Sequence, residues 1–237
     1  MNYVDFVSRL AEGLTIRQTD ADFITLVPAT IDAAEQRCYR ELDLQNTIVR
    51  NSSAVFTPGT RTLNLPSTLG TFKVIENIYA ITPAGQVTPD LGTRNELMPT
   101  SRPFLTATYP SSNGSTVPAY FAMVTDTTII VGPWPDQAYQ VEVTGTIRPL
   151  ALSSSNVTTL LTMYFPDLFL AGALSFAWNL QGEASTTGQL ALAQAQAWEA
   201  NYQSLYQSAQ VEEGRKKFTM EGWSSKAPAP QATPPRT

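Results

Sequence analysis

The side chains that most often carry out acid–base or nucleophilic chemistry are scarce in this sequence. Histidine is absent, which excludes Ser-His-Asp and Cys-His nucleophiles and removes the commonest metal ligand. The single cysteine, Cys38, can form neither an internal disulfide nor a thiolate zinc site. Paired carboxylates such as Asp126 and Asp136 remain, but both lie in turn sequences, where aspartate is a common residue. We therefore expect no enzyme activity, no metal site and no cofactor.

A second set of side chains could bind a ligand without transforming it. Tyr109, Tyr120, Trp134 and Tyr139 lie in one turn-rich region, and such rings can stack on sugars. These residues leave open an alternative function, a carbohydrate- or receptor-binding β module of a virion or surface assembly. The long amphipathic segments on both sides of this region are more than such a module needs.

The charged residues are unevenly distributed. The 237 residues carry a net charge of −5, yet residues 215–237 contain five basic residues and one acid. Among them, the basic residues Arg215, Lys216 and Lys217 and the aromatic residues Phe218 and Trp223 form a composition favoured at interface hot spots. The proline-rich end predicts an extended arm over 215–237 that docks on a partner protein. A solvated tail and a DNA-binding tail are alternatives, and three adjacent charges would give the latter only salt-sensitive affinity.

Amphipathic helix patterns precede and follow the centre of the chain. Thr19 or Asp20 can cap the longer helix within residues 1–46, and Pro28 should either kink it or start its second part. Helical patterns return over residues 151–214. The apolar positions of the first segment are Phe23, Val27, Ile31, Ala34, Cys38 and Leu42. Those of the last helix are Leu190, Ala193, Ala197, Tyr202, Leu205 and Ala209.

The central residues, 47–150, have the character of β-strands. Short runs rich in Val, Ile, Thr, Tyr and Phe alternate with turn residues, which favours a small sandwich or barrel. We predict an α+β fold in which residues 1–46 and 151–214 form a helical bundle. Residues 47–150 form an antiparallel β-sandwich or small barrel inserted into that bundle. The best strand candidates are 60–65, 72–81, 119–124, 127–132 and 139–147.

A rigid corner follows the fourth of these runs. Pro133 and Pro135 lack amide donors, so a sheet ladder cannot continue through them, and Pro135 restricts Trp134 to extended backbone. Asp136 can accept a hydrogen bond from an amide two residues further on, before the next strand begins at Tyr139. We predict a structural bend, with Trp134 packed on its own sheet.

The order of these motifs resembles the adaptor (head-to-tail connector) proteins of tailed bacteriophages, especially those of short-tailed phages. The helix motif of that family is matched by IDAAEQRCYREL at 31–42, and its proline-rich corner by 133–139. Residues 84–117 have no counterpart in the family pattern. The remaining matches are Leu65-Pro66, Pro118-Ala119-Tyr120, RPLALS at 148–153 and PDLFLAGAL at 166–174.

The resemblance implies a structural virion protein of the neck, between capsid and tail, which is assembled in the host cytoplasm. Twelve copies would form a ring that binds beneath the portal protein and extends the DNA channel, through which genomic DNA passes without sequence recognition. The ring would provide the attachment surface for tail nozzle or fibre proteins. The arm residues named above would bind the portal, and Glu35, Arg37, Arg40 and Glu41 are candidates for the ring-forming face of a helix.

Two further expectations concern the location of the protein. The sequence contains no apolar run near the ~18 residues that a membrane span needs. The amphipathic start of the sequence, MNYVDFVSRLAEGL, has no basic beginning and no continuous apolar centre, so we expect no secretory signal.

Overall fold

The computed structural model describes residues 1–184 and 188–220, which fold as two compact units. The helical unit comprises Phe6–Gln45 and the described residues from Tyr164 onward, and the β unit comprises Met1–Asp5 and Asn46–Met163. This combination of helices and sheets confirms the predicted α+β class. In the part of the chain that the structure describes, no helix is long and apolar enough to cross a membrane.

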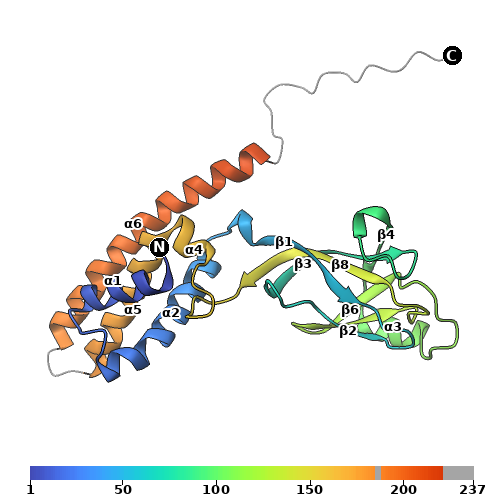
Figure 1. Ribbon diagram of the computed structural model, residues 1–237, viewed down its shortest axis with the longest axis horizontal. Helices are drawn as coiled ribbons and strands as arrows, with labels where there is room; N and C mark the ends of the chain where they lie inside the picture. Colours follow the sequence, from blue (N-terminus) through green and yellow to red (C-terminus); the bar gives the residue numbers. More distant parts are fainter. Residues whose placement is uncertain (185–187, 221–237) are drawn as a thin grey trace, which may run out of the picture. The chain divides into compact units, whose positions relative to one another are not determined.

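Four helices make up most of the helical unit, and α5 packs against the other three (Figure 1). The rings of Phe6 on α1 and Phe169 on α5 stack with their centroids 4.5 Å apart. The predicted packing of the first helices on the last ones is therefore confirmed. The helices are α1 (Tyr3–Leu14), α2 (Ala21–Glu41), α5 (Pro166–Ala184) and α6 (Gly188–Met220).

Helix α2 agrees closely with its sequence pattern. The Asp20 side chain caps it by accepting hydrogen bonds from the amides of Asp22 and Phe23, at 2.9 and 3.4 Å. All six predicted apolar positions, from Phe23 to Leu42, are buried. The helix continues through Pro28, so a second helix does not start there. Pro28 lies on the exposed side, where water can bond the carbonyl that the ring leaves without a donor.

The buried face of α6 differs from the prediction in its first half. Leu190 is 68% exposed, and the buried residues there are Ala191 and Ala195. Small side chains at these positions suit the extensive packing of α6 on α5. Tyr202 and Ala209 are buried as predicted. Over 190–197 the sequence contains only Ala, Leu and Gln, and this pattern does not by itself determine which side of the helix is buried.

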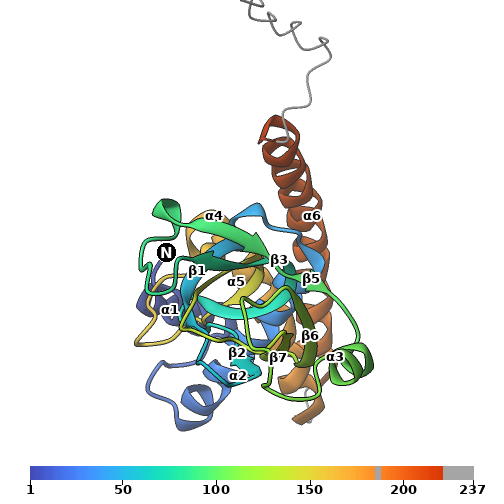
Figure 2. The same ribbon diagram turned by 90° about the vertical axis from the view of Figure 1, so that its right-hand side faces the viewer.

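The β unit contains two four-stranded sheets that share one hydrophobic core (Figures 1 and 2). One has the order β1-β8-β3-β4 and the other the order β2-β7-β6-β5. The shared core confirms a sandwich, although β5 pairs with β6 in parallel and so departs from a purely antiparallel arrangement. The strands are β1 (Ile48–Val55), β2 (Thr62–Asn64), β3 (Gly70–Thr82), β4 (Thr93–Glu96), β5 (Met98–Pro99), β6 (Tyr120–Thr125), β7 (Thr128–Gly132) and β8 (Gln140–Pro149).

The long pair β3–β8 is bent by two bulges. The register shifts between Phe72 and Val74 and again between Ile75 and Asn77. Opposite the bulges, Gly145 lies so close to β3 that a Cβ would overlap the Val74 carbonyl oxygen. Only glycine fits here, as is typical of a bulge where two backbones approach closely.

The remaining short elements are η1 (Gln45–Thr47), η2 (Pro89–Leu91), α3 (Arg102–Thr108) and α4 (Leu160–Tyr164).

Candidate functional site

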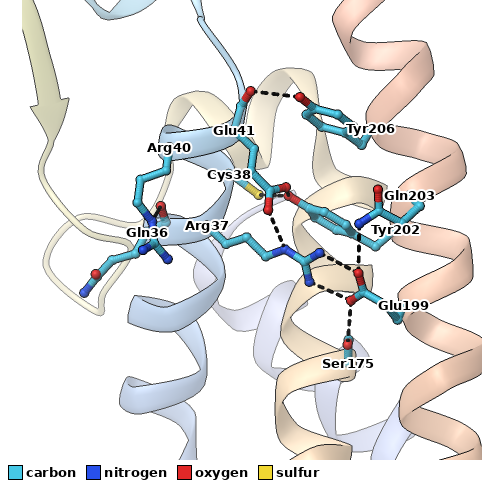
Figure 3. Close-up of polar contacts among 10 residues, drawn as sticks. All are labelled: Gln36, Arg37, Cys38, Arg40, Glu41, Ser175, Glu199, Tyr202, Gln203 and Tyr206. Carbon is cyan, nitrogen blue, oxygen red and sulfur yellow. Dashed lines mark hydrogen bonds and ion pairs between the residues drawn. The ribbon is translucent and has the colours of Figure 1, made fainter.

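A polar cluster joins α2, α5 and α6 in the helical unit (Figure 3). The Arg37 guanidinium donates two hydrogen bonds to the Glu199 carboxylate, both at 2.6 Å, and a third to Glu41 at 3.1 Å. Its central carbon lies 3.9 Å from the centroid of the Tyr202 ring. The Tyr202 hydroxyl donates to Glu41 at 2.6 Å, and that of Ser175 donates to Glu199 at 3.1 Å. We call these five residues the interhelical cluster.

The electrostatics of this cluster indicate a structural role. Hydrogen bonds from Arg37 lower the pKa of Glu199 from 4.5 to about 2, and those to Glu199 raise the pKa of Arg37. Burial raises the pKa of the neighbouring Cys38 thiol to about 12, so it stays protonated and is a poor nucleophile. Burial also raises the pKa of Tyr202. The ion pair therefore stays charged at neutral pH, and the cluster contains no activated nucleophile.

The four candidates for a ring-forming helix face, Glu35, Arg37, Arg40 and Glu41, differ in exposure and in partners. Glu35 is buried, and Arg37 and Glu41 have partners on α6 of the same chain. Arg40 is exposed and donates to the Gln36 carbonyl of its own helix at 3.1 Å. A ring-forming role for these residues stays a prediction, and Arg40 is the member of the set best placed for it.

Part of the segment predicted to be an extended arm is helical. Helix α6 continues to Met220, so the prediction is wrong for residues 215–220, which include Arg215, Lys216, Lys217 and Phe218. Lysines in a last helical turn interact favourably with the helix dipole, and acids three or four residues earlier stabilise them further. Trp223 lies outside the described residues.

The lysines at the end of α6 have partners within the chain. Lys216 Nζ lies 2.8 Å from Glu212 Oε1 and 2.7 Å from Glu213 Oε1, and these bonds raise its pKa. It also lies 5.4 and 5.3 Å from the ring centroids of Tyr164 and Phe165. Lys217 forms an ion pair with Asp43. Because both charges are already compensated, the DNA-binding alternative loses much of its basis.

The proline-rich corner is held by contacts from two other loops, the α3–β6 and β1–β2 connections. The Trp134 indole N–H donates to the Tyr109 carbonyl at 3.2 Å. The Trp134 carbonyl accepts from the Thr116 amide at 2.9 Å, and the Pro135 carbonyl accepts from the Gly59 amide at 2.8 Å. These contacts support the predicted structural bend at Pro133, Trp134, Pro135, Asp136 and Tyr139.

The side-chain partner of Asp136 differs from the expected backbone amide. Its carboxylate accepts a hydrogen bond from the Tyr139 hydroxyl at 2.8 Å. Burial raises the pKa of this tyrosine to about 12, so the hydroxyl remains a donor. The bond links the turn to the residue just before β8, which is again a structural role.

The structure brings together only part of the proposed sugar-binding set. Tyr109 and Tyr120 stack with ring centroids 6.3 Å apart, and Phe104 meets Tyr120 edge-on at 5.8 Å. Tyr139 is buried in the sandwich core instead. A cavity of about 260 Å³ in the β unit is lined by none of these four rings and is smaller than typical ligand pockets of ~300–1,000 Å³. It is lined by Phe72, Lys73, Ile75, Phe121, Met123 and Asp126.

The carboxylates considered for catalysis do not form a site. Asp126 precedes β7 and Asp136 follows it, so the length of that strand, roughly 17 Å, separates them. Asp136 is bonded to Tyr139, as described above. Within residues 1–184 and 188–220, no group of three or more acidic, histidine or cysteine side chains is arranged to hold a metal ion.

Comparison with known families decides the assignment. The model of the SU10 adaptor protein family matches residues 1–226, which is nearly the whole chain. The chain belongs to this family. Its members are head-to-tail adaptors of short-tailed, SU10-like phages, so the resemblance found in the sequence motifs is confirmed and the adaptor has a structural role in the virion neck. No curated protein matches the adaptor sequence.

Sequence reasoning missed several residues that hold the adaptor helices together. Glu199, Asp43 and Glu213 were not among the predicted site residues, and Tyr202 was expected only as an apolar core residue. One signal was available, because Glu199 is the only charged residue between 188 and 211. An isolated acid in a long helical stretch otherwise free of charge suggests a specific basic partner.

Proposed function

We propose that this adaptor forms a ring of twelve copies beneath the portal protein, extends the DNA channel and provides the attachment surface for tail nozzle or fibre proteins. Membership of the SU10 adaptor family is the observation that carries the proposal. Genomic DNA would pass through the ring without sequence recognition. The net charge of −5 suits such a channel, since an acidic wall does not retain phosphates.

The helical unit has surface suited to subunit contacts. A closed ring needs two different patches on each copy that complement one another. Large apolar side chains that the isolated chain leaves exposed are candidates for such patches. Among the described residues of this unit they include Ile24, Tyr164, Leu180, Leu190, Leu192 and Val211.

We place the portal contact at the end of α6 and in the residues that follow it. Because Lys216 and Lys217 are bonded to acids of the same chain, their part is to fix the direction of the helix end. Arg215, Phe218 and Trp223 complete the set. A proline-rich segment after a fixed helix end loses less entropy on docking than a freely moving one.

Co-sedimentation with the portal protein of the same phage tests this function. The full chain should sediment with portal in a fixed ratio. A chain that ends at Met220 keeps all the described contacts of α6, and we expect it to retain its helical circular dichroism but lose portal binding. Stoichiometric binding by the shortened chain would refute a portal contact through the residues after Met220, and failure of the full chain to bind would refute the function.

A further inference from the structure

The segment Glu41–Gln45 carries the chain out of α2 toward β1, and side chains of α6 hold it at several points. The Tyr206 hydroxyl donates to the Glu41 carbonyl at 3.1 Å, in addition to the bond from Tyr202 to the Glu41 carboxylate. Further along, the Gln45 amide donates to Glu213 Oε2 at 3.1 Å. Together with the ion pair between Lys217 and Asp43, these bonds hold every second residue of the segment.

Burial reinforces these polar contacts. The side chains of Leu42 and Leu44 are buried, whereas the Asp43 side chain between them is 84% exposed. Glu213 is itself buried, and its carboxylate is shared between the Gln45 amide and the Lys216 ammonium. Because this one buried carboxylate accepts from both groups, the bonds to the segment and to the helix end depend on each other.

A glycine lies within the continuous helix α6, among these contacts. Gly214 follows Glu213 directly and precedes both lysines, in the interior of a 33-residue helix. A Cβ at this position would meet no atom within 4 Å. Glycine is therefore not required by space, and it weakens the helix because its backbone loses the most freedom on folding.

We infer that residues Tyr202–Lys217 of α6 act as a clasp, which holds the segment Glu41–Gln45 in place. Gly214 lowers the stability of α6 within this clasp. When the end of the helix loosens, the segment is therefore released. The contacts of the clasp are independent of the proposed function. That the portal protein acts on the clasp, by engaging the end of α6, rests on the proposed function. Coupling of this kind is reciprocal, so changes in the segment must also loosen the end of α6.

Two substitutions of Gly214 in the full chain test the clasp, with amide hydrogen exchange at Gln45 as the readout. Gly214→Pro removes a helix hydrogen bond and clashes with the preceding turn, and we expect exchange at Gln45 to become at least about tenfold faster. Gly214→Ala strengthens the helix, and we expect exchange about threefold slower. Unchanged exchange in both variants, with far-UV circular dichroism showing a folded chain, would overturn the inference.

A second pair of variants guards against misfolding of the proline variant. Glu213→Ala removes the acceptor of the Gln45 amide, and we expect about tenfold faster exchange there. Its neighbour Glu212 is exposed, and its one partner among the described contacts is Lys216. Glu212→Ala should therefore change the exchange rate of the Gln45 amide by less than about twofold. Equal effects of the two variants would overturn the clasp. Asp43→Ala should speed exchange over residues 214–217, as reciprocity requires.

Adding the portal protein to the wild-type chain separates the clasp from the proposed function. Faster exchange at Gln45 in the portal-bound chain supports the inference that portal engagement loosens the clasp. Co-sedimentation with unchanged or slower exchange contradicts that release while the proposed function stands. Absence of co-sedimentation refutes the proposed function, and the variants of Gly214 and Glu213 still decide the clasp.

Discussion

Arg37 on α2 and Glu199 on α6 form a two-pronged ion pair although 162 residues separate them in the sequence. Both N–O distances are 2.6 Å, and the guanidinium also lies on the Tyr202 ring. The planar fork of arginine matches a carboxylate in this way, whereas lysine would supply only a point charge. This pair ties the helices before the β unit to those after it.

The first prediction concerns that pair. Arg37→Ala removes both bonds to Glu199, the bond to Glu41 and the contact with the ring, and we expect the free energy of unfolding to fall by about 2 kcal/mol. The exposed Arg40 serves as the matched control, since Arg40→Ala should cost less than about 0.5 kcal/mol. Urea denaturation measures both. Equal losses would show that the cluster does not stabilise the helical unit.

The second prediction is a pH dependence. The pKa of Glu199 in the folded chain, about 2, lies below its ordinary value of 4.5, so its contribution is complete above pH 4.5 and is lost as pH falls toward 2. The Glu199 side chain is 38% exposed, so solvent screens its pairing with Arg37. We therefore expect the free energy of unfolding to fall by about 1 kcal/mol, which is less than the shift in pKa alone would give. The difference in unfolding free energy between wild type and Glu199→Gln should shrink over this range. A constant difference would contradict the assignment.

The third prediction concerns the close approach of β3 and β8. Gly145→Ala should lower the free energy of unfolding by about 2–4 kcal/mol, because its Cβ would overlap the backbone of Val74. Thr144→Ala, a half-buried neighbour on the same strand, should cost less than about 1 kcal/mol. Thermal unfolding compares the two variants. A tolerated Gly145→Ala would mean that the strands separate easily at the bulge.

The fourth prediction distinguishes a structural corner from a ligand site. Tyr139→Phe removes the hydroxyl that bonds to Asp136, and we expect a loss of about 1 kcal/mol in stability. Because Asp136 is exposed, water can replace the lost donor. Co-sedimentation with the portal should be unchanged. A variant that keeps wild-type stability but loses a binding activity would favour the alternative of a receptor-binding module.

Local patterns explain which parts of the fold were predictable. The apolar stripe of α2 and its cap at Asp20 depend on neighbours in the sequence, and both are confirmed. The run IVRNSSAV, which forms β1, was missed because its central polar residues lie at an irregularity in the pairing with β8. Strands β4 and β5 and helix α3 contain four, two and seven residues, too few for a periodic signal.

The candidate site was less predictable because its contacts are long-range. The sequence marks Arg37 as a helix residue, but its partner Glu199 follows only from the packing of α2 and α6. The helical state of 215–220 likewise depends on tertiary contacts such as the pair of Lys217 with Asp43, in addition to local composition. Composition alone therefore did not predict that residues 215–220 are helical.

Electron microscopy of the full chain mixed with its portal protein tests the central claim most directly. We predict one additional closed ring beneath each portal, formed by twelve copies of the adaptor, with an open channel through its centre. Portal particles that carry no added ring at saturating adaptor, or adaptor bound at a different face of the portal, would contradict the account.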